Sequence, residues 1–342
     1  MAMLLALACA ATCLLSLALV RLVIGYSRRT MLDVPCERSS HSRPTPTGGG
    51  AGFVAAFFLS GFVWAFLLDD FSKPSLYWLL GLSLPLCIVG FLDDRKGLPA
   101  LLRLLAHLLV SAAGVAWLMF LNPPPDLAQP WLFLVAGFAV IAVTGVINIT
   151  NFMDGMDGLV AGSLAVAFSF FGWWLAESMW WLLTSALLGF LFWNWSPAKI
   201  FMGDVGSTAL GGLAAVAGLR VLLPSFTAET STLARDWPFL AVFLPVLGDG
   251  VYTLTRRALK GENILKAHHS HIYQRLMRSG LGHSPIAASY IAFTLVLGLL
   301  ASFFHIWGAC AGLALFLAAL LWSERRIQRA GVPFRVPSRK DT

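Results

Sequence analysis

The sequence predicts an all-α, polytopic integral membrane protein whose helices form a bundle of about eleven spans, with ten as the alternative. Of its 342 residues, 58% are hydrophobic and only 12% are charged, and the mean hydropathy is +0.77. Soluble domains carry about 25% charged residues, so a globular core does not account for this excess. Apolar runs of about 20 residues cross a ~30 Å hydrocarbon core as helices, and the alternation typical of barrel strands does not occur.

The predicted spans follow the apolar runs in order. They cover residues 3–25, 48–68, 75–92, 101–121, 131–149, 158–176, 179–194, 207–223, 238–256, 285–304 and 307–322. The polar segments between them predict cytoplasmic loops at 26–47, 93–100, 149–158, 195–206 and 257–284, and a cytoplasmic tail at 323–342. No soluble domain or internal repeat interrupts the pattern, so residues 1–342 are expected to form one membrane-embedded domain.

Positive charge predicts how the spans are oriented. Of the 24 Lys and Arg residues, only Lys73, Arg220 and Arg235 fall on the predicted outer side. Short loops rich in Lys and Arg stay in the cytoplasm, so the N-terminus is expected to be periplasmic and the C-terminus cytoplasmic. The same loops account for the pI near 9.4, which argues against a nucleic-acid-binding patch.

Carboxylates gather on the predicted inner side. They are Asp33, Asp93, Asp94, Asp154, Asp157, Asp204 and Asp249. Carboxylates that converge repel one another and stay ionised together only when cations share their site. Hard oxygen ligands without cysteine predict Mg²⁺, with Mn²⁺ as a substitute, and magnesium in turn indicates a phosphate on the substrate.

The most informative segment is NITNFMDGMDG, residues 148–158. Asn148, Asn151, Asp154 and Asp157 recur every three residues, and this spacing stacks side chains on one face of a helix. Polar groups near lipid cost free energy, so four of them in register indicate a site. The structural alternative is an asparagine-capped turn.

Three further inner-side motifs each have a structural alternative. The loop RSSHSRPTPTGGG, residues 38–50, is either an anion-binding glycine run or a helix entry. The pair Asp93 and Asp94 is either a site or a solvated helix end. In NWSPAKIFMGDVGS, residues 194–207, Asp204 is either a metal ligand or an N-cap, and Phe201 either packs in the core or stacks on a base.

A histidine-rich loop and a buried acid complete the candidates. The segment KAHHSHIYQRLMR, residues 266–278, offers His268, His269 and His271 to a diphosphate. Its alternatives are a solvated amphipathic helix and a zinc site, but HExxH spacing and nearby cysteines are missing. Asp249 lies inside a predicted span, where an acid is a functional candidate whose partner the sequence does not identify.

Taken in chain order, these motifs resemble one family. HSRPTPTGGG, the Asp93–Asp94 pair, NxxNxxDGxDG, NxxPAKIFMGDxGS and the histidine-rich loop are similar to the polyprenyl-phosphate N-acetylhexosamine-1-phosphate transferases of glycosyltransferase family 4. The resemblance covers nearly the whole chain and is closest to the subgroup that initiates O-antigen synthesis. It departs in the histidine loop, where relatives carry HHH or HxHH and this chain carries HHSH, so the essential histidine stays open.

The resemblance implies a fold and a reaction. The expected fold is a helical bundle of ten or eleven spans in the bacterial inner membrane, with its site on the cytoplasmic face. The expected reaction moves a sugar 1-phosphate from a UDP-N-acetylhexosamine to undecaprenyl phosphate, requires Mg²⁺ and releases UMP. A homodimer is left open as an assembly. Which N-acetylhexosamine is used cannot be read from these motifs.

The resemblance also implies roles for individual residues. Asn151 and Asp204 would hold Mg²⁺. The expected catalytic residues are Asp93, Asp94, Asp154, Asp157, His269 and His271. The expected substrate-binding residues are Arg43, Asn194, Phe201, His268 and Asp157. Among them, Asp93 would bind or deprotonate the lipid phosphate, and Asn194 and Phe201 would contact the uridine.

Rival functions fit less well. The peptidoglycan step catalysed by phospho-N-acetylmuramoyl-pentapeptide transferase is the alternative within the family, but its triple histidine followed by an acid is missing here. A transporter would hold its polar groups near the bilayer midplane and often contains inverted repeats. In this chain the polar groups gather at one predicted face.

Overall fold

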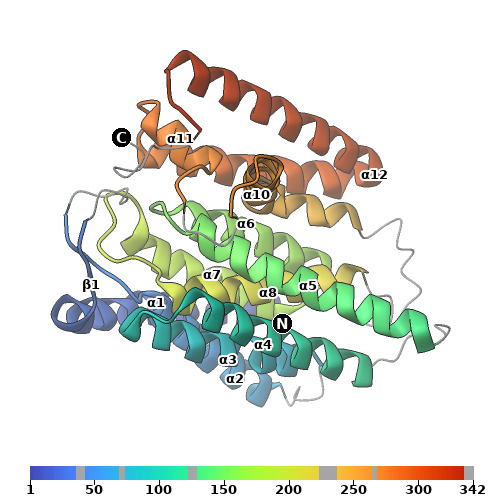
Figure 1. The fold of residues 1–342 in the computed structure, drawn as a ribbon. Coiled ribbons are helices and arrows are strands. Elements are labelled where there is room, and N and C mark those ends of the chain that lie inside the picture. Colours follow the sequence, from blue (N-terminus) through green and yellow to red (C-terminus); the bar gives the residue numbers. More distant parts are fainter. Residues whose placement is uncertain (36–42, 69–73, 122–128, 223–236, 264–267, 335–342) are drawn as a thin grey trace.

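The computed structural model describes residues 1–35, 43–68, 74–121, 129–222, 237–263 and 268–334, and it is helical almost throughout (Figure 1). The elements are α1 (Ala2–Thr30), β1 (Leu32–Asp33), β2 (Thr45–Pro46), α2 (Gly50–Leu67), α3 (Pro74–Lys96), α4 (Ala100–Leu121), α5 (Gln129–Met153), α6 (Leu159–Trp174), α7 (Ser178–Asn194), α8 (Asp204–Leu222), η2 (Trp237–Phe243), η3 (Leu244–Gly248), α10 (Asp249–Leu259), α11 (Ile272–Arg278) and α12 (His283–Arg329). Every predicted span coincides with a helical segment, which confirms the all-α membrane class.

Seven of the described helical segments are long and apolar enough to cross a membrane. They include the continuous segment Trp237–Leu259 and the 47-residue α12, whereas α6 and α7 are shorter, at 16 and 17 residues. Inside α12, His305 has non-helical dihedral angles (φ 47°, ψ −122°), and two helices meet there. The chain folds back at this point, as Figure 1 shows, so α12 contains both of the last two predicted spans.

The helices extend further into the predicted loops than the polarity of the sequence indicated. α1 continues to Thr30, α3 to Lys96 and α5 to Met153, while α12 continues to Arg329. Helical hydrogen bonding satisfies the backbone at the membrane edge, so polar residues there continue a helix rather than end it. As a result Asp93, Asp94 and Asn151 lie on the last turns of helices, and the inner loops are shorter than 26–47, 93–100 and 149–158.

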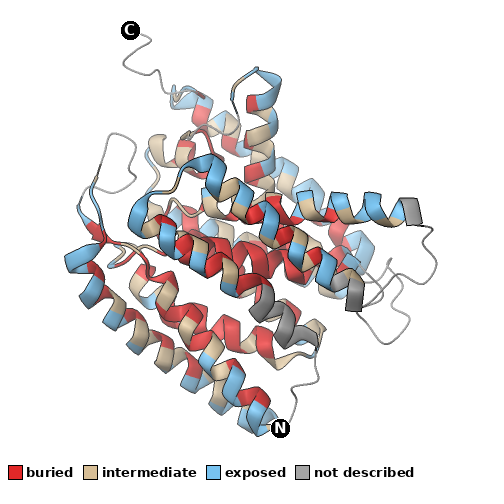
Figure 2. Cartoon of the chain, turned by 60° about the horizontal axis from the view of Figure 1, so that its bottom comes forward, coloured by how far each residue is buried: buried red, intermediate tan, exposed pale blue. Residues whose placement is uncertain are grey.

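α8 runs through the centre of the bundle and packs against α3 and α5. In its apolar segment 78% of residues are buried, against 17% in α1 and α4. Figure 2 shows the same contrast between a buried interior and exposed outer helices. α8 is rich in Gly and Ala, and small residues let helix backbones approach closely in a membrane. At Gly211, for example, an added Cβ would lie 2.7 Å from the Cα of Ile147.

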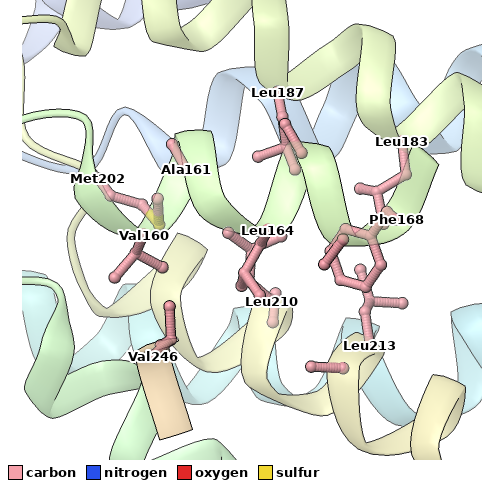
Figure 3. Close-up of a cluster of buried hydrophobic side chains, with 14 of the residues drawn as sticks. Val160, Ala161, Leu164, Phe168, Leu183, Leu187, Met202, Leu210, Leu213 and Val246 are labelled. Atoms are coloured by element: carbon pink, nitrogen blue, oxygen red, sulfur yellow. The ribbon is translucent and has the colours of Figure 1, made fainter. Parts of the chain in front are cut away.

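The apolar core lies where α6, α7 and α8 meet. In Figure 3, Leu164 and Phe168 of α6 lie between Leu183 and Leu187 of α7 and Leu210 and Leu213 of α8, while Val160 lies beside Met202 and Val246. Phe168 also stacks on Trp180, with ring centroids 5.4 Å apart. This core fixes the start of α6, the end of α7 and the start of α8 relative to one another. Asp157, Asn194 and Asp204 lie at or next to these three ends.

Candidate active site

Two aspartates from different helices share one arginine. Asp93, in the last turn of α3, accepts a hydrogen bond from the backbone N–H of Leu98 (2.5 Å), and its Oδ2 lies 2.8 Å from Nη1 of Arg103 on α4. The same Nη1 lies 3.2 Å from Oδ2 of Asp204 at the start of α8. The Asp93 side chain is 7% exposed and the Asp204 side chain 26%. The guanidinium therefore compensates two partly buried carboxylates that would otherwise repel one another.

The neighbouring Asp94 has a different contact. Its Oδ1 accepts a hydrogen bond from the backbone N–H of Asp204 (2.8 Å), and its Oδ2 accepts one from the N–H of Val205 (3.1 Å). A carboxylate at this position satisfies the free N–H groups at the start of α8 and interacts favourably with the helix dipole. Gly203 permits this approach, because it has φ +74° and an added Cβ would lie 2.6 Å from Oδ2 of Asp94. Asp94 thus supplies the cap of α8, and the side chain of Asp204 is left for other contacts.

Asn151 joins Asp204 from the last turn of α5. Its Nδ2 donates to Oδ1 of Asp204 (2.9 Å) and to Oγ of Ser207 (2.9 Å). The amide nitrogen of Asn151 makes both contacts. The Oδ1 atom of Asn151 accepts no hydrogen bond within the described part of the chain. The two residues predicted to hold a metal therefore lie in direct contact.

Asp154 follows α5 directly and lies within the field of the other acids. Burial, together with the negative charges of Asp204, Asp94 and Asp157, raises the pKa of Asp154 well above its usual range. A nearby cation would lower that pKa again, because it favours the charged carboxylate. The predicted helical register therefore does not extend to Asp154 and Asp157, because α5 ends at Met153, although Asp154 still lies within the electrostatic influence of Asp204.

Asp157 lies further along the same segment and has different partners. Its Oδ2 accepts a hydrogen bond from the backbone N–H of Ala198 (3.2 Å) and lies 3.3 Å from Nδ1 of His283, the first residue of α12. Burial acts to raise the pKa of Asp157, but the hydrogen bond and charge of His283 and the N–H of Ala198 outweigh it and hold that pKa below its usual value. Asp157 therefore joins the loop before α8 to α12.

Asn194 lies in a structural position. Its Oδ1 accepts from the N–H of Gly158 (2.9 Å), its Nδ2 donates to the carbonyl of Ile200 (2.9 Å), and the residue is 4% exposed. Both ends of its amide therefore hold loops together. The N–H of Phe201 donates to the carbonyl of Pro46 (2.8 Å), which ties the same loop to β2. A contact of Asn194 or Phe201 with a uridine stays a prediction.

The described part of the glycine run before α2 favours the helix-entry alternative. The N–H of Gly49 donates to the carbonyl of Phe201 (2.9 Å), and the N–H of Gly50 donates to the carbonyl of Met202 (2.8 Å). These donors are therefore already satisfied. An added Cβ at Gly50 would lie 2.3 Å from the Cα of Gly206, so the glycines serve the close approach of two backbones.

The histidines lie on the segment before α11. The rings of His268 and His271 are 4.8 Å apart, and Gln274 Nε2 lies 3.4 Å from Nδ1 of His269. Burial, and then the charges of His271, Arg257 and His269, lower the pKa of His268 to about 3, so His268 is neutral near pH 7. A neutral imidazole can still bind a ligand through hydrogen bonds, so the predicted contact of His268 with a diphosphate stays a prediction.

The histidine segment contacts the end of α5. The hydroxyl of Tyr273 donates to the carbonyl of Phe152 (3.2 Å), and the ring of His268 lies 6.4 Å from that of Phe152. An added Cβ at Gly155 would lie 2.3 Å from the Tyr273 hydroxyl oxygen. Gly155 therefore leaves room for Tyr273, and the histidines are held beside the segment that carries Asp154.

The predicted site residues thus fall into groups. Asp93, Asp94, Asn151 and Asp204 lie together with Asp154 beside them, and the histidines adjoin the same end of α5. Arg43 is exposed, and its described contact is a carbonyl that accepts a hydrogen bond from the hydroxyl of Thr45 (3.0 Å). A direct role for Arg43 in this group therefore stays a prediction.

Sequence reasoning missed three residues of the site: Arg103, Ser207 and His283. The signal for Arg103 was present, because an arginine inside a predicted apolar span is a functional candidate for the same reason as Asp249. Ser207 and His283 gave no such signal. One is a hydroxyl among small residues, and the other lies 126 positions after Asp157, its contact in the fold.

The oxygen atoms of Asp204 and Asn151 are of the kind that Mg²⁺ prefers. The described residues contain no group of three or more His, Cys, Asp or Glu side chains arranged to hold a metal. Mg²⁺ commonly takes only one or two carboxylates from the protein and completes its shell with water and substrate phosphates. Asp204 and Asn151 supply oxygen ligands of that kind.

Known proteins show similarity to this chain over much of its length. The sequence model of Glycosyl transferase family 4 matches residues 76–222. A phospho-N-acetylmuramoyl-pentapeptide-transferase of Shouchella clausii is 35% identical over 202 residues, which is 52% of this chain and 61%, less than two thirds, of that relative. A relative of the same name from Trichormus variabilis is 32% identical over 291 residues, 75% of this chain and 73% of its own length.

A second kind of relative is similar as well. A "Probable undecaprenyl-phosphate N-acetylglucosaminyl 1-phosphate transferase" of Bacillus subtilis is 28% identical over 267 residues, which is 74% of this chain and 71% of that relative. The helical membrane fold, the motifs and the extent of these matches agree. The chain belongs to glycosyl transferase family 4.

Proposed function

We propose that this protein transfers N-acetylhexosamine 1-phosphate from a UDP-sugar to undecaprenyl phosphate, releasing UMP and forming undecaprenyl-diphospho-N-acetylhexosamine. The observation that carries the proposal is that Arg103 contacts Asp93 and Asp204, and that Asn151 contacts the same Asp204, with Asp93, Asn151 and Asp204 coming from three different helices. Two anionic substrates repel each other, so a site that joins them needs cations and oxygen ligands held in one place. The names of the relatives support the same chemistry.

The residues of this chain have separable roles in that reaction. Arg103 and Asp93 bind the phosphate of the lipid acceptor, and His269 and His271 contact the diphosphate of the donor. Asp204 and Asn151 would hold Mg²⁺, which when bound neutralises charge on the diphosphate and on departing UMP. Asp94 fixes the start of α8 and thereby the position of Asp204, while Asp154 and Asp157 order the adjoining loop.

The transfer is a single displacement in this proposal. An oxygen of the lipid phosphate attacks the phosphorus that carries the sugar, a new phosphoanhydride bond forms, and the bond from that phosphorus to the oxygen of UMP breaks. Asp93 removes the acceptor proton if the phosphate arrives monoprotonated. Holding both substrates in line supplies much of the rate acceleration by positioning. A sugar-phosphate adduct on the enzyme, trapped without lipid, would instead indicate a two-step path.

The decisive experiment measures UMP release by purified protein in detergent. The reaction contains undecaprenyl phosphate, Mg²⁺ and one member of a panel of UDP-N-acetylhexosamines that includes GlcNAc, FucNAc and QuiNAc. We expect UMP release that requires both substrates and the metal, and the panel identifies the sugar. Failure with every UDP-N-acetylhexosamine, in protein that is folded by thermal melting, would overturn the proposal.

The peptidoglycan step is the second candidate function. It is favoured by one observation, the 32–35% identity to relatives named phospho-N-acetylmuramoyl-pentapeptide-transferase. The HHSH loop argues against it, because the expected triple histidine and following acid are missing. UDP-N-acetylmuramoyl-pentapeptide in the same panel separates the two functions.

The setting of the reaction is part of the proposal. The product would begin an O-antigen or related surface glycan in the bacterial inner membrane. The N-terminus would be periplasmic, and the site and the C-terminus cytoplasmic, since the basic loops and the site residues share one end of the bundle. A homodimer is compatible with this arrangement and can be tested by light scattering of the detergent-solubilised protein.

A further inference from the structure

Asp249 is a buried acid that the proposed chemistry does not use. It is the first residue of α10, and the residue is 1% exposed. A carboxylate removed from water is costly unless hydrogen bonds and charges compensate it, so its partners reveal what it does. Those partners come from three different elements.

Four hydrogen bonds converge on this carboxylate. Its Oδ1 accepts from the backbone N–H of Ile272 (2.9 Å) and the hydroxyl of Thr253 (3.1 Å). Its Oδ2 accepts from the backbone N–H of Tyr273 (3.2 Å) and the hydroxyl of Tyr290 (2.7 Å). Asp249 thus satisfies the first N–H groups of α11 and joins that helix to α10 and α12.

The same carboxylate adjoins the most deeply buried histidine of the loop. Nδ1 of His271 lies 3.5 Å from Oδ1 of Asp249, and His271 is 1% exposed. Within the described residues neither Nδ1 nor Nε2 of His271 has a hydrogen-bond partner, so Asp249 is a close charged neighbour of Nδ1 rather than its hydrogen-bond acceptor. A carboxylate beside one ring nitrogen fixes the orientation and tautomer of an imidazole and makes the other nitrogen the ligand-binding atom.

Tyr273 holds this unit beside the remaining site residues. It is fully buried, its ring stacks on His271 with centroids 5.8 Å apart, and its hydroxyl reaches the carbonyl of Phe152 at the end of α5. A displacement of the start of α11 would therefore move His271 relative to Asp154. The position of His271 therefore depends on Asp249, which lies on α10 and binds the start of α11.

We infer that Asp249 is a positioning residue, which holds His271 and the start of α11 so that the imidazole contacts the diphosphate of the donor. This inference rests on the proposed function. A purely structural role is the alternative, in which Asp249 only stabilises the packing of α10, α11 and α12. The two roles differ in whether the effect of Asp249 on turnover requires His271.

The test is a double-mutant cycle on kcat and KM for the UDP-sugar. Asp249→Asn is expected to lower kcat about 10- to 100-fold, the range typical when the partner that orients an essential histidine is removed. In a His271→Ala background the same substitution should cause no further loss of kcat. Losses that multiply in the double variant, or an Asp249→Asn protein with wild-type kcat, would overturn the inference.

A milder pair of variants keeps the test valid if Asp249→Asn does not fold. Tyr290→Phe removes one hydrogen bond from Oδ2 and keeps the carboxylate, so we expect a loss in kcat of about 3- to 10-fold that also vanishes in the His271→Ala background. Thr294→Val is the matched control. It removes a buried hydroxyl one turn away on α12, which bonds the carbonyl of Tyr290 and does not reach Asp249. Its kcat should equal that of the wild type, and an equal loss in both variants would contradict the inference.

A readout without turnover separates this inference from the proposed function. Selective ¹⁵N labelling of histidine reports the tautomer of His271, and Asp249→Asn should shift its Nδ1 and Nε2 resonances while Thr294→Val leaves them unchanged. Wild-type protein that releases no UMP would contradict the function alone. Unchanged His271 resonances in Asp249→Asn would contradict the positioning role alone.

Discussion

The carboxylate of Asp94 accepts a hydrogen bond from the backbone N–H of Asp204, 2.8 Å away. Two acids that the sequence places 110 positions apart are thus arranged so that one caps the helix that presents the other. The neighbouring Asp93 turns to Arg103 instead. Adjacent residues on a helix point in different directions, and here that geometry gives the Asp93–Asp94 pair two separate tasks.

The capping role predicts a stability effect for Asp94. Asp94→Ala should lower the free energy of unfolding by about 1–2 kcal/mol, because two N–H groups at the start of α8 lose their acceptor. Thermal melting in detergent measures this, with Asp94→Asn as the conservative variant. An Asp94→Ala protein that melts like the wild type would exclude the capping role.

Asp204 is expected to matter for turnover and much less for folding. Asp204→Asn keeps the shape of the side chain but removes a negative charge that would hold Mg²⁺. We expect kcat to fall about 100-fold or more, the range found when one preorganised electrostatic contact is lost. The melting temperature should change little, because Asp94 rather than the Asp204 side chain caps α8. Wild-type turnover in well-folded Asp204→Asn protein would remove it from the metal role.

Arg103 is predicted to govern affinity for the lipid phosphate. Its guanidinium already contacts Asp93 and Asp204, and its side chain is 34% exposed, so it can also reach an anion at the membrane edge. Arg103→Ala should raise KM for undecaprenyl phosphate about 10- to 100-fold, as expected for a lost charge-assisted hydrogen bond. KM for the UDP-sugar serves as the internal control and should change far less. Equal changes in both KM values would indicate a general distortion of the site.

The helical spans were predictable because lipid leaves the chain few alternatives. An apolar run of the right length must become a helix, and even the break near His305 falls between two predicted spans. The site was predictable in part, since Asn151, Asp154 and Asp204 carry polar groups where hydrocarbon is expected. The partners of these residues were not, because local spacing does not report which helices pack together. Arg103 contacts Asp204 only because α4 packs against α3 and α5, the two helices that flank α8, and the sequence does not contain that arrangement explicitly.

The glycine run at residues 48–50 also shows that a sequence motif does not identify its partner in the fold. Its N–H groups could serve an anion or another backbone, and the sequence does not distinguish the two. The structure gives them carbonyl partners in the loop that precedes α8. A motif therefore specifies which groups are offered, and tertiary packing decides which partner takes them.

Removing the metal should abolish activity without unfolding the protein. The proposed ligands are Asp204 and Asn151, and the surrounding helices are held by apolar packing. EDTA should therefore eliminate UMP release, while the melting temperature without substrate stays within the error of the untreated protein. Mg²⁺ should restore turnover, and Mn²⁺ should do so in part. A large fall in melting temperature on chelation would indicate a structural metal instead.

Acid should destabilise the contact between Asp157 and His283. The pKa of Asp157 is held below its usual value, so the carboxylate contributes stability above about pH 4, and that contribution is lost as pH falls through its folded pKa. His283→Asn should weaken the interaction and raise the pH at which acid lowers the melting temperature. Melting curves between about pH 3 and pH 7 test this. Identical pH profiles for both proteins would contradict the prediction.

Gly50 offers the sharpest test of how the site is assembled. It is the first residue of α2, and an added Cβ would lie 2.3 Å from the Cα of Gly206 and 2.4 Å from its nitrogen. Both contacts are backbone atoms of α8 and cannot move aside as a flexible side chain could. Gly50→Ala must therefore push α2 away from the start of α8, and we expect destabilisation of about 2–3 kcal/mol together with a fall in kcat.

Gly25→Ala is the matched control for this substitution. Gly25 also lies in a helix, and an added Cβ there would meet no atom within 4 Å. Helix propensity alone predicts that this change stabilises the protein by up to about 1 kcal/mol. If Gly50→Ala melted and turned over like Gly25→Ala, the contact between α2 and α8 would not determine the position of Asp204. Opposite effects of two identical substitutions would instead show that the close approach at Gly50, rather than glycine as such, holds the site together.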